Sequence, residues 1–126
     1  DTEKVNQAKE LASLCKKYNS LFIVNDRIDI ALAVDADGIH LGQKDMVINE
    51  ARKLVGNKII GITCHNSMRL AKIAIKSKAN YLAFGAFNKT KTKKAKFYAN
   101  TKILKNVFKI KSEIHITKLD RKEKSM

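Results

Sequence analysis

Two carboxylates follow two short apolar runs of the sequence, at the points where buried strands would end. Asp26 comes directly after the run "LFIVN", and Asp45 comes four residues after the run "DGIHL". Two carboxylates that converge repel each other unless a cation lies between them or one of them is protonated. Oxygen ligands of this kind suit Mg²⁺, which keeps several waters and bridges to substrate phosphates. The pattern therefore indicates a magnesium-dependent phosphate site.

Other polar side chains also follow apolar runs. They are Asn25 beside Asp26, Gln43 before Asp45, the trio Thr63, Cys64 and His65 after a third run, and Thr90, Thr92 and Lys93 after a fourth. The lysine and hydroxyl groups of "TKTK" are donors that bind phosphate oxygens well. Their shared location after the runs is the feature that suggests one site.

Helix capping is the competing interpretation of both acids. Asp26 precedes "RIDIALA" and Asp45 precedes "VINEARKL", so either side chain could accept backbone N–H bonds at the start of a helix. His40 lies inside the second run and is expected to be a hydrogen-bonded core residue, whereas His65 is the better site candidate. No set of nucleophile, base and orienting group can be assembled around Cys64, which argues against cysteine catalysis.

The elements that must position these residues alternate along the chain. Short apolar runs are expected to form strands over 21–25, 37–41, 58–63 and 81–85, with 113–117 as a further candidate, and helical patterns cover 2–19, 27–36, 47–56, 67–79 and 99–108. This order predicts an α/β fold with about four parallel strands. An open doubly wound sheet and a (β/α) barrel both remain open, although no GxGxxG or GxxxxGK[ST] motif supports a nucleotide-binding open sheet. Both architectures place their sites at the carboxyl ends of strands.

Composition narrows the class of protein further. The 126 residues are 44% hydrophobic, enough for a packed core, and the net charge is +14. Residues 86–126 hold 13 Lys/Arg against 3 acids, but 22 of the 26 cations in the chain are lysines, which are usually solvated surface. The sequence has no apolar run of the roughly 18 residues that span a membrane and no charged leader, so we expect a cytoplasmic protein that does not enter membranes.

Three stretches taken together resemble a known family. "IVNDRIDIALAVDADGIHLGQKDM", "IIGITCHN" and "YLAFGAFNKTKTK" are similar to consecutive motifs of thiamine-phosphate synthase, a (β/α)8 barrel enzyme of thiamine biosynthesis. The resemblance implies transfer of a pyrimidinylmethyl group from hydroxymethylpyrimidine diphosphate to a thiazole phosphate, which yields thiamine phosphate and pyrophosphate. It also implies Mg²⁺ as cofactor and small phosphorylated molecules as substrates.

The resemblance implies roles for particular residues. Asp26 and Asp45 would coordinate Mg²⁺. The pyrimidine diphosphate would be bound by Asn25, Thr63 and Lys93, and the thiazole phosphate by Thr90, Lys91 and Thr92. The sequence departs from the family in one loop, because the family's proline-containing segment before T-x-T-K reads "GAFNKTKTK" here and the chain has no proline.

The resemblance covers only part of a barrel. The family's first two strands, with a Q-x-R-x-K stretch, and its later glycine-rich phosphate loop have no counterpart here. We therefore expect a truncated barrel of doubtful activity over 1–108, a basic segment over 109–126, and association into a homo-oligomer that covers the open sheet edges. The alternatives are a thiazole tautomerase-like enzyme, disfavoured by Asp26, Asp45 and Lys93, and a noncatalytic module that binds nucleic acid through residues 86–126.

Overall fold

Strands and helices alternate along the chain in the computed structural model, which describes residues 2–85, 100–110 and 115–119. The elements are α1 (Thr2–Lys17), β1 (Ile23–Asn25), α2 (Ile28–Ala33), β2 (Gly38–Leu41), α3 (Ile48–Val55), β3 (Ile59–His65), α4 (Met68–Lys76), β4 (Tyr81–Gly85), α5 (Thr101–Ile110) and β5 (His115–Leu119). The α/β class and the four expected strands are confirmed, and β5 overlaps the further candidate. The chain divides into two compact units, residues 1–61 and 62–126, and β3 crosses the boundary.

The first unit is built on the parallel pair β1 and β2. Their register pairs Ile23 with Gly38, Val24 with Ile39, and Asn25 with His40. Because side chains alternate between the faces of a strand, Val24 and Ile39 share one face while Asn25 and His40 share the other. Ile39 is fully buried and Val24 nearly so. The face with Val24 and Ile39 therefore belongs to the core, and the opposite face carries the polar residues.

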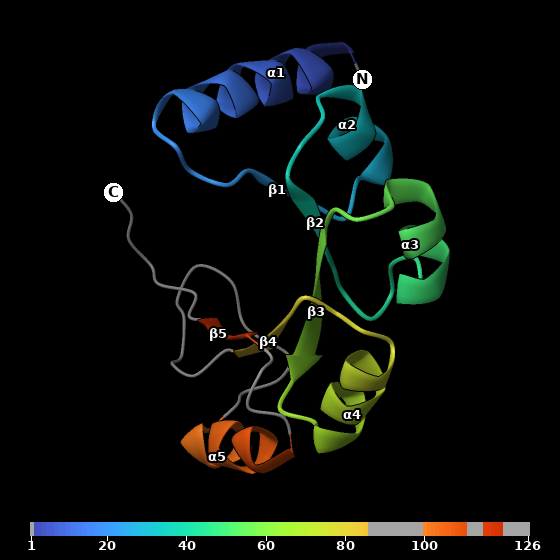
Figure 1. The fold of residues 1–126 in the computed structure, drawn as a ribbon, viewed down its shortest axis with the longest axis vertical. Coiled ribbons are helices and arrows are strands. Elements are labelled where there is room, and N and C mark those ends of the chain that lie inside the picture. Colours follow the sequence, from blue (N-terminus) through green and yellow to red (C-terminus); the bar gives the residue numbers. More distant parts are fainter. Residues whose placement is uncertain (1, 86–99, 111–114, 120–126) are drawn as a thin grey trace. The chain divides into compact units, whose positions relative to one another are not determined.

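Helices α2 and α3 supply the rest of this core, and Figure 1 shows them beside β1 and β2. Their inward residues are apolar and buried; they are Ile28, Ile30 and Ala31 of α2 and Ile48, Ala51 and Val55 of α3. Spacings of three and four residues place such side chains on one face of a helix. In contrast, α1 buries only Ala8 and leaves Leu11 and Leu14 about half exposed.

One lysine holds the turn between α2 and β2 at the amino ends of the strands. The Nζ atom of Lys58, just before β3, donates to Oδ1 of Asp35 and to the carbonyl oxygen of Ala36, both at 2.6 Å. The backbone N–H of Ile59 also donates to the carbonyl of Asp37 at 3.0 Å. These bonds fix where β2 begins, and hence which of its residues reach its carboxyl end.

The second unit contains another parallel pair, β4 and β5, in which Tyr81 pairs with His115 and Gly85 with Leu119. Leu82, Ala83 and Phe84 of β4 are completely buried. Helix α4 begins at a serine cap, because Oγ of Ser67 accepts a bond from the N–H of Leu70 at 3.1 Å. Within the described residues, no helix is long and apolar enough to cross a membrane. The expected division at residue 108 stays a prediction.

Two glycines of the first unit are required for different reasons, which gives a test of the fold. A Cβ on Gly38 would lie 2.6 Å from Cβ of Ile59, whereas Gly56 has open space around it but a φ of +64°. We expect Gly38→Ala to lower the free energy of unfolding by about 2–3 kcal/mol through overpacking. Gly56→Ala should lower it by about 1 kcal/mol through backbone strain. Urea unfolding measures both, and a Gly38→Ala protein as stable as its parent would contradict the packing.

Candidate functional site

The first acid of the site directly follows β1. The backbone N–H of Asp26 donates to the carbonyl oxygen of His40 at 2.8 Å, which fastens the end of β1 to β2. Asp26 adopts a φ of +53°, a conformation that is uncommon for residues other than glycine and is most tolerated by Asn and Asp. The chain therefore turns sharply at Asp26, and its side chain is exposed at the carboxyl end of the strand.

The second acid is held in a turn that follows β2. Oδ2 of Asp45 accepts a hydrogen bond from the N–H of Gly42 at 2.6 Å, and the N–H of Asp45 donates to the carbonyl of Gly42 at 3.2 Å. Asp26 and Met46, the residue after Asp45, also line one depression of about 500 Å³. The structure thus brings the segments that carry the two acids together.

Neither acid caps a helix, so the capping interpretation is wrong for both. Helix α2 has Arg27 at its N-cap and α3 has Val47, and neither cap forms a side-chain hydrogen bond. Within the described part of the chain, the Asp26 carboxylate has no hydrogen bond or ion pair, and the Asp45 carboxylate bonds only to Gly42. Both carboxylates are therefore available as ligands.

The cation closest in sequence to Asp26 is engaged elsewhere. Arg27 donates from Nε and Nη2 to the two carboxylate oxygens of Asp29, at 2.9 and 2.8 Å. The hydrogen bond to Asp29 and, more weakly, the charge of Asp26 raise the pKa of Arg27. The same hydrogen bond lowers the pKa of Asp29 to about 2. This bidentate pair ties the guanidinium to Asp29, which leaves the Asp26 carboxylate open.

His40 lies in β2 as expected, but it is half-buried and not enclosed in the core. As the register partner of Asn25, it shares the polar face of the pair with that residue. Burial lowers the pKa of His40, and the negative charge of Asp45 partly opposes this. His40 therefore lies beside Asn25 and feels the charge of Asp45, at a place where sequence reasoning did not expect it.

In the second unit, Thr63, Cys64 and His65 occupy the carboxyl end of β3. Thr63 and His65 are half-buried, and His65 has a φ of +52°. Cys64 is completely buried, and burial raises the pKa of its thiol to about 12. A thiol with this pKa is protonated at neutral pH, which agrees with the prediction that Cys64 is not a nucleophile. The other expected phosphate ligands, Thr90, Lys91, Thr92 and Lys93, lie outside the described residues.

The donor set fits a hard cation that keeps part of its water shell. The described residues contain no group of three or more His, Cys, Asp or Glu side chains that could hold a metal ion. Two carboxylates with waters and phosphate oxygens form the coordination that Mg²⁺ commonly takes in phosphate sites, whereas a structural zinc site needs four protein ligands. Asp26 and Asp45 thus suit Mg²⁺ better than zinc.

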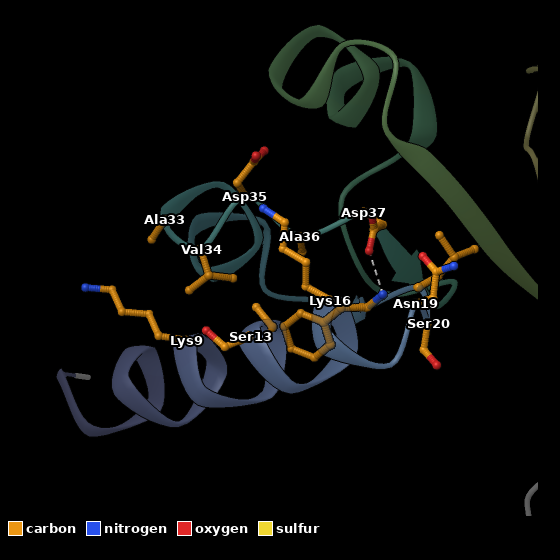
Figure 2. Close-up of a pocket in the computed structure, with 13 residues that line it drawn as sticks. Lys9, Ser13, Lys16, Asn19, Ser20, Ala33, Val34, Asp35, Ala36 and Asp37 are labelled. Carbon is orange, nitrogen blue, oxygen red and sulfur yellow. Dashed lines mark hydrogen bonds between the residues drawn. The ribbon is translucent and has the colours of Figure 1, made fainter.

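A larger cavity of the first unit lies at the opposite ends of the strands. It measures about 710 Å³ and is lined by α1 and by the segments before β1 and β2. Figure 2 shows Lys9, Ser13 and Lys16 of α1 on one side of it. Its two acids are already engaged, because Asp37 accepts the N–H of Phe22 at 2.7 Å and Asp35 pairs with Lys58. No residue of the candidate site lines it, so we regard it as a feature of helix packing.

Comparison with known proteins identifies the family. The model of the thiamine monophosphate synthase family matches residues 1–117, and the chain belongs to this family. A thiamine-phosphate synthase of Pelagibacter ubique is 52% identical over 104 residues, which are 82% of this chain and 50% of the relative. Another, of Prochlorococcus marinus, is 56% identical over 94 residues, 74% of this chain and 27% of the relative.

A solved structure agrees with the sequence relatives. Thiamine phosphate pyrophosphorylase from Pyrococcus furiosus superposes with a TM-score of 0.83 at 33% identity, over 94% of this chain and 56% of that protein. The neighbour has a TIM-barrel-like fold, so the predicted fold class is confirmed. The synthase relatives are transferases of thiamine biosynthesis, and this chain spans half or less of the two compared. Neither the tautomerase-like nor the nucleic-acid-binding alternative gains support.

The ion pair of Arg27 and Asp29 predicts that part of the free energy of unfolding is lost at low pH. Because the pKa of Asp29 is depressed in the folded chain, the pair stabilises the fold above pH of about 4, and this contribution is lost as the pH falls toward 2. In Arg27→Met, we expect the pKa of Asp29, followed by carboxyl-carbon NMR, to return toward its ordinary value. Lys53→Met, which removes another surface cation, should leave it unchanged. An unaltered pKa in Arg27→Met would contradict the pairing.

Proposed function

We propose that Asp26 and Asp45 hold Mg²⁺ and that the site they form binds the diphosphate of an aminopyrimidine methyl diphosphate. The observation that carries the proposal is that two carboxylates, neither of them a helix cap, stand at adjoining strand ends with oxygens left free. Carboxylates without a bound cation would repel a diphosphate. A substrate of this class therefore requires a cation between the two carboxylates and the diphosphate. Membership of the synthase family supports a phosphorylated small molecule as substrate.

The remaining roles follow from the chemistry of each side chain. The amide of Asn25, at the end of β1, would donate to a diphosphate oxygen, and the hydroxyl of Thr63 would contact the same substrate. Lys93 would add a positive charge to the diphosphate, and Thr90, Lys91 and Thr92 would bind the phosphate of the thiazole. The magnesium ion, when bound, supplies charge neutralisation of the diphosphate.

The reaction that we propose for the whole protein is the synthase reaction. The bond between the pyrimidinylmethyl carbon and the diphosphate oxygen breaks, and its electron pair leaves with pyrophosphate. The thiazole nitrogen then donates its lone pair to the same carbon, which gives thiamine phosphate. Negative charge accumulates on the departing diphosphate, so donors fixed at its binding site lower the barrier. Asn25 fits this task because it is the last residue of a strand and not part of a loop.

Metal titration tests the site directly. We expect the chain to bind Mn²⁺ or Mg²⁺, detected by electron paramagnetic resonance or calorimetry, and to bind the pyrimidine diphosphate more tightly when metal is present. Asp26→Asn and Asp45→Asn should each weaken metal binding by about 10-fold or more. Glu50→Gln is the matched control, because it removes a surface carboxylate whose ion-pair partner among the described residues is Lys53.

Two outcomes would overturn the proposal. The first is a parent chain that binds neither the metal nor the pyrimidine diphosphate in its presence. The second is binding of random oligonucleotides that weakens steeply with salt and is unchanged in Asp26→Asn, which would instead favour the nucleic-acid-binding module. Weaker substrate binding in Lys93→Ala would support the assignment of that residue.

We further propose that the chain associates with a second copy of itself. Large apolar side chains stand exposed on and after α1, namely Leu11 at 51%, Leu14 at 52%, Tyr18 at 66% and Leu21 at 66% exposure. We expect the sedimentation coefficient to rise with concentration, and Leu11→Gln with Leu14→Gln to shift the protein toward monomer. Leu54→Gln, which changes an equally exposed leucine of α3, is the control. A stable, well-folded monomer at all concentrations would refute association.

A further inference from the structure

The turn between β2 and α3 joins Gly42 and Asp45 by two reciprocal hydrogen bonds. The N–H of Gly42 donates to Oδ2 of Asp45 at 2.6 Å, and the N–H of Asp45 donates to the carbonyl of Gly42 at 3.2 Å. The first bond uses the charged oxygen and is short, as hydrogen bonds to carboxylates are. It therefore constrains the side chain of Asp45 as well as the backbone of the turn.

We propose that Gly42 is a positioning residue for the metal site, which acts by fixing Oδ2 of Asp45 through its backbone N–H. This inference rests on the proposed function, because it assigns Asp45 as a metal ligand. Within the described part of the chain, Oδ1 of Asp45 has no hydrogen-bond donor, so it is the oxygen left for the ion. Groups that orient metal ligands commonly change metal affinity by roughly 10- to 100-fold when they are removed.

The space around Gly42 shows how a side chain at this position would affect Asp45. Its φ is not in the left-handed region, so backbone freedom is not the reason. A Cβ at Gly42 would lie 3.2 Å from Oδ2 of Asp45, closer than an ordinary van der Waals contact. A side chain at this position would therefore require the carboxylate of Asp45 to shift by a few tenths of an ångström. Such a shift would disturb the carboxylate oxygen that the N–H of Gly42 holds.

The position of Gly42 in the fold makes it an effective anchor. It directly follows Leu41, the last residue of β2, which is almost completely buried. The N–H of Gly42 is thus attached to a strand of the core, while Asp45 lies three residues farther along the turn. A donor directly after a packed strand is held more firmly than a donor farther along a loop.

Hydrogen exchange tests the bond without any metal. We expect the Gly42 amide to be protected from exchange in the metal-free parent chain and to lose protection in Asp45→Ala. In Asp45→Asn the amide should stay protected, because the asparagine oxygen can still accept the bond while the charge is gone. An unprotected Gly42 amide in the parent chain would overturn the inference, whatever the metal affinity.

Metal affinity tests the consequence, with Mn²⁺ alone as the probe. We expect Gly42→Ala to weaken Mn²⁺ binding about 10-fold. Gly56→Ala is the control, because it strains a glycine that has no contact with the site and should lower stability but not affinity. A Gly42→Ala chain that binds Mn²⁺ as tightly as its parent, while Asp45→Asn does not, would overturn the role of Gly42 and leave the metal site intact. No binding by the parent would instead refute the proposed metal site.

Discussion

The parallel pairing of β1 with β2 is the constraint on which the candidate site depends. This pairing sets Asn25 beside His40, and the N–H of Asp26 continues it by one more bond to the His40 carbonyl. A slip of one residue would turn Asn25 to the opposite face of the strand pair and move Asp26 away from the turn that holds Asp45. The buried partners Val24 and Ile39 oppose such a slip, so the core fixes the register that the chemistry requires.

Local arrangement and not overall charge decides what this chain can bind. The protein carries a net charge of +14, yet the segments after β1 and β2 present carboxylates, and the guanidinium of Arg27, next in sequence to Asp26, is bonded to Asp29. In the proposed site, this local acidity would attract a cation first and, through that cation, an anionic substrate. The positive charge of the rest of the chain would then favour the approach of the phosphorylated substrates that we propose.

Much of this architecture could be predicted from the sequence, because short apolar runs that alternate with helical patterns are compatible with few fold classes other than a parallel α/β fold. The positions of Asp26 and Asp45 after strands could be predicted for the same reason. Whether these acids cap helices could not, because the N-cap of α2 lies one residue after Asp26 and that of α3 two residues after Asp45, and sequence patterns do not fix helix ends that closely. The bond from Gly42 to Asp45 escaped prediction because it depends on the path of a turn and not on residue type.

The left-handed backbone at Asp26 has a consequence for how this position can vary. Three other residues with positive φ, Asn19, Asp35 and Lys78, follow the ends of helices, where such a conformation commonly closes the last turn. Asp26 instead directly follows a strand. Aspartate, asparagine and glycine all tolerate the conformation, so the backbone alone does not select among them. Of these three residues, only aspartate carries a negative charge. A replacement by asparagine or glycine would therefore keep the backbone conformation after β1 but remove the charge.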